Sequence, residues 1–209
     1  MSAANLRVVE HPLLEHSLTI LRDQNTSRAD FRHHAGVVSK VLLIDVTREA
    51  ALADVRVTTP LAETAGQQFA DRIVVVPVLR AGLAMLMAAQ DLLIDVSVGF
   101  MGLERDEETA VAREYYRNMP DDLASQWVIV LDPMLATGGS LDGTVCALKD
   151  KGAQRITLLC IVSAPEGIQR VTENHPDVTL ITAAVDERLD ANKFIVPGLG
   201  DFGDRYFGT

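Results

Sequence analysis

The feature that most restricts the fold is a series of short apolar runs, rich in β-branched residues, in the later two-thirds of the chain. These runs lack alternation of apolar and polar side chains, and several are separated by segments with helical composition. Strands that are apolar on both faces are typical of a parallel sheet covered by helices on each side. The sequence therefore predicts an α/β fold with a central parallel sheet. The expected strands are 73–77, 96–100, 127–131, 156–162 and 178–182, and the expected helices are 82–92, 140–151 and 165–174.

The length of the chain indicates one domain. It has 209 residues, of which 48% are hydrophobic, so a single core of ordinary size is expected. Residues 1–60 are expected to form a helical extension, because Phe31, Ala35, Val38 and Leu42 recur at helical spacing after a possible N-cap at 26–27. The α/β core is expected at 73–185, and a separate C-terminal segment at 186–209.

Composition also limits location and partners. No apolar run approaches the length of a membrane span, and Met1 to Glu10 lacks the pattern of a secretory signal, so a cytoplasmic protein without membrane contact is expected. Cys146 and Cys160 lie among apolar neighbours and are expected to be buried free thiols. The net charge of −10 disfavours nucleic-acid binding. A phosphate site in such a chain must depend on backbone amides and a few placed arginines.

The segment 128–140 carries the clearest chemical signal. An apolar strand ends at Asp132, and a loop with Thr137, Gly138 and Gly139 leads into a helix near Ser140. Glycines allow backbone N–H groups to approach a phosphate closely, and a helix start adds unpaired donors. No lysine follows the glycines, so this is not a Walker loop. An ordinary strand-to-helix turn is the alternative interpretation.

Three other segments have two interpretations each. Residues 104–120 are charged and contain Tyr115 and Tyr116, which suits either a flap over a site or a solvated excursion. Arg80 follows an apolar strand and is either an anion clamp or part of a strand-end salt bridge. The tail 198–203 matches G-x-G-x-x-G, but too little chain follows for a dinucleotide-binding unit. It is either backbone that approaches something closely or a flexible tail.

The loop 131–140 resembles the phosphoribosyl-diphosphate loop of the uracil phosphoribosyltransferases, within the type I phosphoribosyltransferases. The resemblance extends over nearly the whole chain, in the order of that family. The other segments that carry it are His11-Pro-Leu, Val76 to Gly82, Arg105 to Thr109, Ala164 to Gly167, His175-Pro-Asp177 and Pro197 to Gly203.

This resemblance implies a pentosyltransferase of pyrimidine salvage that joins uracil to 5-phosphoribosyl 1-diphosphate, giving UMP and diphosphate. It implies Arg80, Arg105 and Asp132 as catalytic residues, and a flap or hairpin near 104–120. The residues implied to bind phosphoribosyl diphosphate are Arg80, Arg105, Asp132, Pro133, Met134, Leu135, Ala136, Thr137, Gly138, Gly139, Ser140 and Asp201. The residues implied to bind uracil, in the base-binding segment 186–209, are Ile195, Gly200, Asp201 and Phe202.

The resemblance further implies Mg²⁺ held mainly through the substrate, with no metal ligand assigned to the protein. It also implies a homo-oligomer, dimer or tetramer, and GTP as a possible activator. Phe202 stands where the family often has alanine, and its ring is expected to line the uracil pocket. Two alternatives remain: a phosphoribosyltransferase for another nucleobase, and a regulator that keeps the fold but binds RNA.

Overall fold

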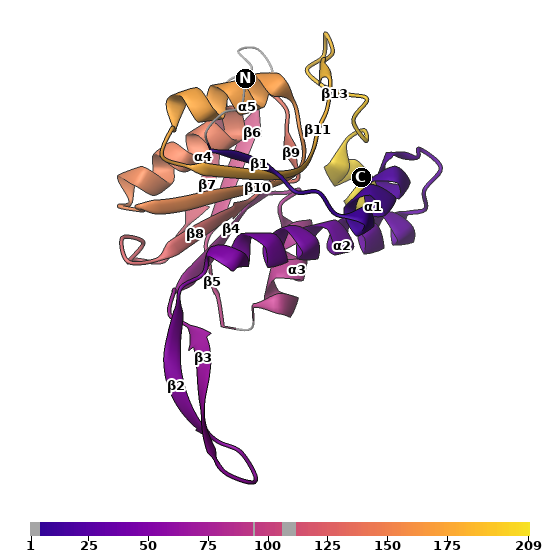
Figure 1. Ribbon diagram of the computed structural model, residues 1–209. Helices are drawn as coiled ribbons and strands as arrows, with labels where there is room; N and C mark the ends of the chain where they lie inside the picture. The colour runs from indigo at the N-terminus through magenta and orange to yellow at the C-terminus, as the bar shows by residue number, and fades with distance from the viewer. Residues whose placement is uncertain (1–4, 94, 106–111) are drawn as a thin grey trace.

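The computed structural model describes residues 5–93, 95–105 and 112–209, and the side chains of Glu104, Arg105 and Ala112 lie outside this description. A nine-stranded, mostly parallel sheet has the order β1-β11-β10-β8-β4-β6-β7, with β5 beside β4 and β9 beside β10 (Figure 1). The predicted α/β fold is confirmed. Its strands are β1 Leu6–Val8, β4 Ile73–Leu79, β5 Ser97–Val98, β6 Phe100–Arg105, β7 Ala112–Asn118, β8 Trp127–Leu131, β9 Met134–Leu135, β10 Arg155–Ser163 and β11 Thr179–Val185.

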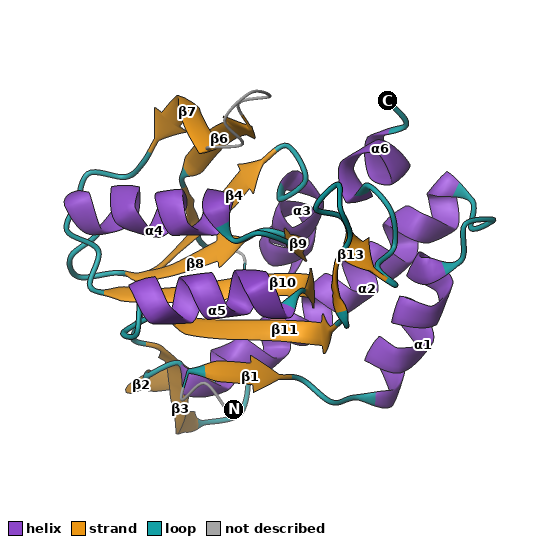
Figure 2. Ribbon diagram, turned by 90° about the horizontal axis from the view of Figure 1, so that it is seen from above, coloured by secondary structure: helices purple, strands orange, loops and turns teal. Residues whose placement is uncertain are grey.

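Helices cover both faces of the sheet, which explains why its strands lack alternation (Figure 2). Val74, Val76 and Val128 pack into the core beneath α4 (Gly139–Asp150) and α5 (Pro165–Asn174). Their neighbours Val75 and Ile129 belong to the core on the opposite face. Three helices cover that second face: α1 Pro12–Arg22, α2 Arg28–Val46 and α3 Leu83–Leu92. Every position of a central strand is therefore buried on one side or the other.

The N-terminal region is only partly the helical extension that was expected. Ser27 caps α2 by accepting a hydrogen bond from the N–H of Asp30, as the sequence predicts. The strand β1 instead adds to the sheet edge, where Leu6 pairs with Leu180 of β11. A short 3₁₀ turn, Thr47–Glu49, ends this region.

Residues 52–69 form a β-hairpin that projects from the body of the molecule (Figure 1). Its strands are β2 (Leu52–Thr58) and β3 (Glu63–Phe69), paired from Leu52 with Phe69 to Thr58 with Glu63. The prediction of helix up to residue 60 is wrong here. Apolar and charged residues alternate in β2 with a period of two, and β-branched residues favour a strand over a helix.

The charged segment 104–120 does form a hairpin, from β6 and β7, which pair antiparallel. Residues 106–111, between the two strands, lie outside the described residues. Tyr115 and Tyr116 are exposed on β7. None of the helices that the structure describes combines the length and apolar character needed to cross a membrane.

The C-terminal segment returns to the carboxyl ends of β10 and β11 (Figure 2). It contains the antiparallel pair β12 (Arg188–Leu189) and β13 (Ile195–Val196), followed by the short helix α6 (Phe202–Phe207). A short helix thus begins within the glycine motif, at Phe202. The motif nevertheless lies outside any β-α-β unit, so it is not a dinucleotide fingerprint.

Candidate active site

The predicted phosphate loop lies at the carboxyl end of β8, in the middle of the sheet. Strand β8 has β10 on one side and β4 on the other. Ligands of open parallel sheets bind at this edge. The loop surrounds a hollow of about 80 Å³, lined by Asp132, Met134, Leu135, Ala136, Thr137, Gly138, Gly139, Ser140 and Leu141. These are the residues of the predicted loop, with Leu141 in addition and without Pro133.

Gly138 shapes this loop and caps helix α4. Its φ of 79° is in the left-handed region, which glycine adopts at little cost. A Cβ at this position would lie 3.0 Å from the carbonyl oxygen of Gly167 in α5. The unpaired N–H groups of the first turn of α4 begin immediately after it. The loop is therefore pressed against α5 on one side and offers helix-start donors on the other.

Asp132 provides a buried carboxylate at the bottom of the hollow. One oxygen accepts a hydrogen bond from the N–H of Met134, at 3.2 Å. Burial raises the pKa of Asp132 to about 7, although the Met134 N–H lowers it slightly. Among the described residues no basic side chain offsets this burial. The group is consequently poised between its neutral and ionised forms near neutral pH.

Arg80 lies close to this loop because β4 and β8 are neighbours, with Pro77 beside Leu131. Its side chain is exposed, directly after the end of β4. The turn that carries it is packed tightly, since a Cβ on Gly82 would lie 2.3 Å from the carbonyl oxygen of Leu131. The glycine thus brings the Arg80 turn against the end of β8. Arg105 ends β6, the next strand outward, and its side chain is among those not described.

The predicted uracil-binding residues lie together in the C-terminal segment. Ile195 is in β13, and Gly200 has a φ of 81° just before α6. Asp201 is the N-cap of α6 and accepts a hydrogen bond from the N–H of Asp204 at 2.8 Å. Within the described part of the chain, the N–H and C=O of Gly200 and the N–H of Asp201 make no hydrogen bond to protein. These backbone groups are available to a ligand.

The ring of Phe202 lies in the core. It is 1% exposed and packs edge to face on Phe31, with ring centroids 5.2 Å apart, and stacks with Tyr206. The expectation that this ring lines a pocket is therefore not supported, because the side chain points into the core covered by α1, α2 and α3. Only the backbone of Phe202 is placed like that of Gly200 and Asp201.

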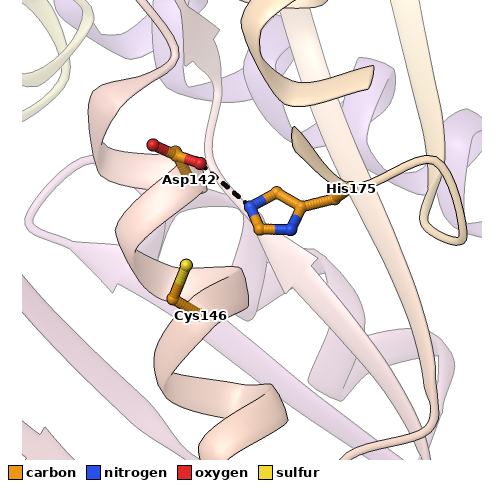
Figure 3. A group of neighbouring side chains, drawn as sticks. All are labelled: Asp142, Cys146 and His175. Atoms are coloured by element: carbon orange, nitrogen blue, oxygen red, sulfur yellow. Dashed lines mark hydrogen bonds and ion pairs between the residues drawn. The ribbon is translucent and has the colours of Figure 1, made fainter. Parts of the chain in front are cut away.

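Asp142, Cys146 and His175 form a cluster of potential metal ligands that sequence reasoning missed (Figure 3). The four-residue spacing of Asp142 and Cys146 in α4 was its only local signal. Asp142 accepts hydrogen bonds from His175 at 2.9 Å and from Arg170 at 2.8 Å.

Burial raises the pKa of Asp142, but hydrogen bonds from Asn174, Arg170 and His175 outweigh this, so the pKa lies below its usual value. The Lys149 ammonium group is also 3.5 Å from His175. Because Arg170 already pairs with the carboxylate and both of its oxygens accept hydrogen bonds, this cluster does not suit a metal and instead ties α4 to α5. Cys146 is exposed rather than buried as expected, since the core side of α4 is formed by Val145, Leu148 and their neighbours.

The sheet order, with the predicted phosphate loop at its carboxyl edge, gives the chain the fold of the type I phosphoribosyltransferases. The solved structure of a hypoxanthine phosphoribosyltransferase from Staphylococcus aureus shares this fold, with a TM-score of 0.52 at 12% identity over 91% of this chain and 94% of that one.

Closer relatives identify the family within this class. A family model described as uracil phosphoribosyltransferase matches residues 8–209. The uracil phosphoribosyltransferase of Campylobacter fetus is 46% identical over 205 residues, 98% of each chain. The solved structure of the AQ2163 protein from Aquifex aeolicus has a TM-score of 0.93 at 33% identity, covering 98% of each chain. The chain belongs to the uracil phosphoribosyltransferase family, which confirms the resemblance seen in its motifs.

Proposed function

We propose that this chain catalyses the reaction for which its family is named, the transfer of a 5-phosphoribosyl group from its 1-diphosphate to uracil, giving UMP and diphosphate. The observation that carries this proposal is the hollow between Asp132 and Ser140, at the carboxyl edge of the sheet. It combines a helix start, a left-handed glycine and a buried carboxylate. This set suits a phosphate next to a polyhydroxylated sugar.

The loop would bind the 5′-phosphate of phosphoribosyl diphosphate, and Asp132 would bind its ribose. The amides and hydroxyls from Ala136 to Ser140 would hold the 5′-phosphate, which avoids the need for many basic residues in a chain of net charge −10. Asp132 would accept hydrogen bonds from the ribose hydroxyls, which favour its ionised form. The remaining residues of the loop, Pro133, Met134 and Leu135, would shape the backbone around the ribose.

Arg80 and Arg105 would hold the diphosphate leaving group. Their strands end at the same edge of the sheet as the phosphate loop. A guanidinium group binds phosphate oxygens through two parallel donors, and this binding strengthens as negative charge develops on the leaving group. Mg²⁺ bound through the substrate would neutralise further diphosphate charge. The partly satisfied carboxylate of Asp132 is compatible with such an ion, directly or through water.

Uracil would bind to the backbone of the C-terminal segment. One edge of uracil presents a carbonyl, an N–H and a second carbonyl in order. The free N–H and C=O groups around Gly200 and Asp201 would supply donors and an acceptor for part of such an edge, and Ile195 and Phe202 would contribute from the same segment. Cytosine reverses two of these groups and would leave buried partners unpaired, so it is expected to be rejected.

The proposed assembly is a homo-oligomer. One face of the β2–β3 hairpin carries Ala53, Val55 and Val57, whereas the other carries Asp54 and Arg56. Val57 is exposed although apolar, and so is Leu61 at the hairpin tip, whereas the exposed Phe69 pairs with Leu52 and lies on the other face. Two-stranded hairpins are marginally stable alone, and an apolar face of this kind suits a second copy of the chain. The cytoplasmic location, expected from the sequence pattern, and a nucleotide activator such as GTP, implied by the family resemblance, stay predictions.

The activity is tested with a panel of nucleobases, each supplied with phosphoribosyl diphosphate and Mg²⁺, followed by detection of the nucleotide. Uracil is expected to give UMP, and cytosine, hypoxanthine and adenine to give little product. A preference for a different base would favour the alternative phosphoribosyltransferase. Tight RNA retention on a filter without any nucleotide product would favour the regulator.

A further inference from the structure

A buried ion pair connects the C-terminal segment to the first helix of the chain. Arg22 is the last residue of α1, and Asp186 directly follows β11. Two nitrogens of the Arg22 guanidinium donate to the two oxygens of Asp186, at 2.8 and 2.6 Å. The Asp186 side chain is 4% exposed, so its charge is almost fully withdrawn from water. A buried pair of this kind is costly to disrupt on one side only.

The same two side chains hold both backbone polar groups of Gly198. The Gly198 N–H donates to Asp186 at 2.8 Å, and its carbonyl accepts from Arg22 at 2.8 Å. Gly198 has a φ of 62°, and a Cβ there would lie 2.1 Å from the carbonyl oxygen of Ile195. The backbone at Gly198 is therefore closely packed, and its hydrogen bonds to the ion pair fix its position.

The following carbonyl is held in a similar way by Arg205. Its guanidinium donates to the Leu199 carbonyl at 2.6 Å and also to the Leu21 carbonyl, and it lies over the ring of Phe31. The carbonyls of two consecutive residues, Gly198 and Leu199, are thus occupied by arginines. The next free backbone groups in the chain are those of Gly200 and Asp201, the groups that match uracil.

We propose that Arg22 and Asp186 are positioning residues for the nucleobase. They do not face the hollow of the phosphate loop, and their hydrogen bonds end on the segment two residues before Gly200. By holding Gly198 they set the position of the backbone edge that reads the base. This inference rests on the proposed function, because it assumes that uracil binds to Gly200 and its neighbours. A shift of that edge by a fraction of an ångström weakens aligned hydrogen bonds.

The test replaces Arg22 with lysine and, in a second variant, Asp186 with asparagine. Arg22→Lys keeps the positive charge but loses the fork that reaches both the carboxylate and the Gly198 carbonyl. The expected result is a KM for uracil raised at least about tenfold, with the KM for phosphoribosyl diphosphate changed less than about twofold. Calorimetric binding of UMP should weaken in the same variants. Discrimination against cytosine should fall as well, because the edge that rejects it has moved.

Arg155→Lys is the matched control. Arg155 also bridges a carboxylate and a backbone carbonyl, those of Asp71 and Glu49, but at the amino end of β10. Its replacement should lower the melting temperature without changing the uracil KM. Circular dichroism confirms that each variant is folded.

An unchanged uracil KM in both Arg22→Lys and Asp186→Asn, with wild type forming UMP, would overturn the inference. An equal rise in the uracil KM of Arg155→Lys would also overturn it, since loss of stability alone would then suffice. A wild-type protein that forms no UMP would instead overturn the proposed function, and the inference with it.

Discussion

At the residue scale, the buried carboxyl group of Asp132 makes the stability of the protein depend on pH. Its pKa of about 7 in the folded chain lies above the 3.8 that is usual for a solvated aspartate. The folded state therefore binds the proton more tightly than the unfolded state does. The stability contributed by this proton is complete below about pH 4 and is lost as the pH rises through about 7.

Asp132→Asn is accordingly expected to be more stable than wild type at about pH 8 and less stable than wild type at about pH 5. The difference between the two free energies of unfolding should change by on the order of 2 kcal/mol between these pH values. The asparagine has the same shape but no charge to bury. Urea unfolding of both proteins at the two pH values measures this. Parallel pH profiles would contradict the pKa. The variant should also bind phosphoribosyl diphosphate more weakly, since ribose hydroxyls prefer the ionised carboxylate.

Phe202 is expected to affect stability rather than base selectivity. Its ring packs on Phe31 and Tyr206 in the core. Phe202→Ala should therefore cost about 3–5 kcal/mol, and Phe202→Leu considerably less. The ratio of turnover with uracil to turnover with 5-fluorouracil should be the same in Phe202→Leu as in wild type. A changed ratio in that folded variant would show that the ring contacts the base.

At the scale of elements, the phosphate loop depends on the contact between the start of α4 and α5. Gly138→Ala places a Cβ 3.0 Å from the Gly167 carbonyl in a left-handed conformation. Activity should fall at least about a hundredfold, with a stability loss of about 1–2 kcal/mol. Gly143→Ala is the control in the same helix, because a Cβ there has no neighbour within 4 Å. It should keep full activity and gain about 0.5–1 kcal/mol. Equal activity of the two variants would show that the activity does not require a glycine at position 138.

At the scale of the whole molecule, the β2–β3 hairpin is expected to hold copies of the chain together. Val57→Asp adds a charge to its apolar face and should shift the protein to a smaller species in analytical ultracentrifugation. Thr58→Asp adds the same charge to the opposite face of the hairpin and should leave the size unchanged. A wild type that sediments as a monomer would contradict the proposed assembly, as would equal effects of the two substitutions.

The strands of the sheet and the loop between β8 and α4 were predictable because their causes are local. Strand β8 and helix α5 occupy the expected ranges, since continuous apolar runs and a proline at a helix start are visible in the sequence. The glycines before α4 similarly indicate a close approach of backbone to a ligand. The His-Pro segments also have local roles, for His11 accepts a hydrogen bond from the N–H of Leu13 and caps α1.

Only the tertiary structure showed the contacts between residues that lie far apart in the sequence. Phe202 packs on Phe31, and the segment proposed to bind the base is held by Arg22 and Asp186, which are 164 residues apart. Residues 52–60 were predicted as helix but belong to a hairpin whose two strands are mostly exposed, so their side chains match no core face. Local periodicity determines which segments become strands and helices, because it depends on neighbouring residues. Which side chains meet across the chain depends on the packing of the complete fold, and the sequence does not display it.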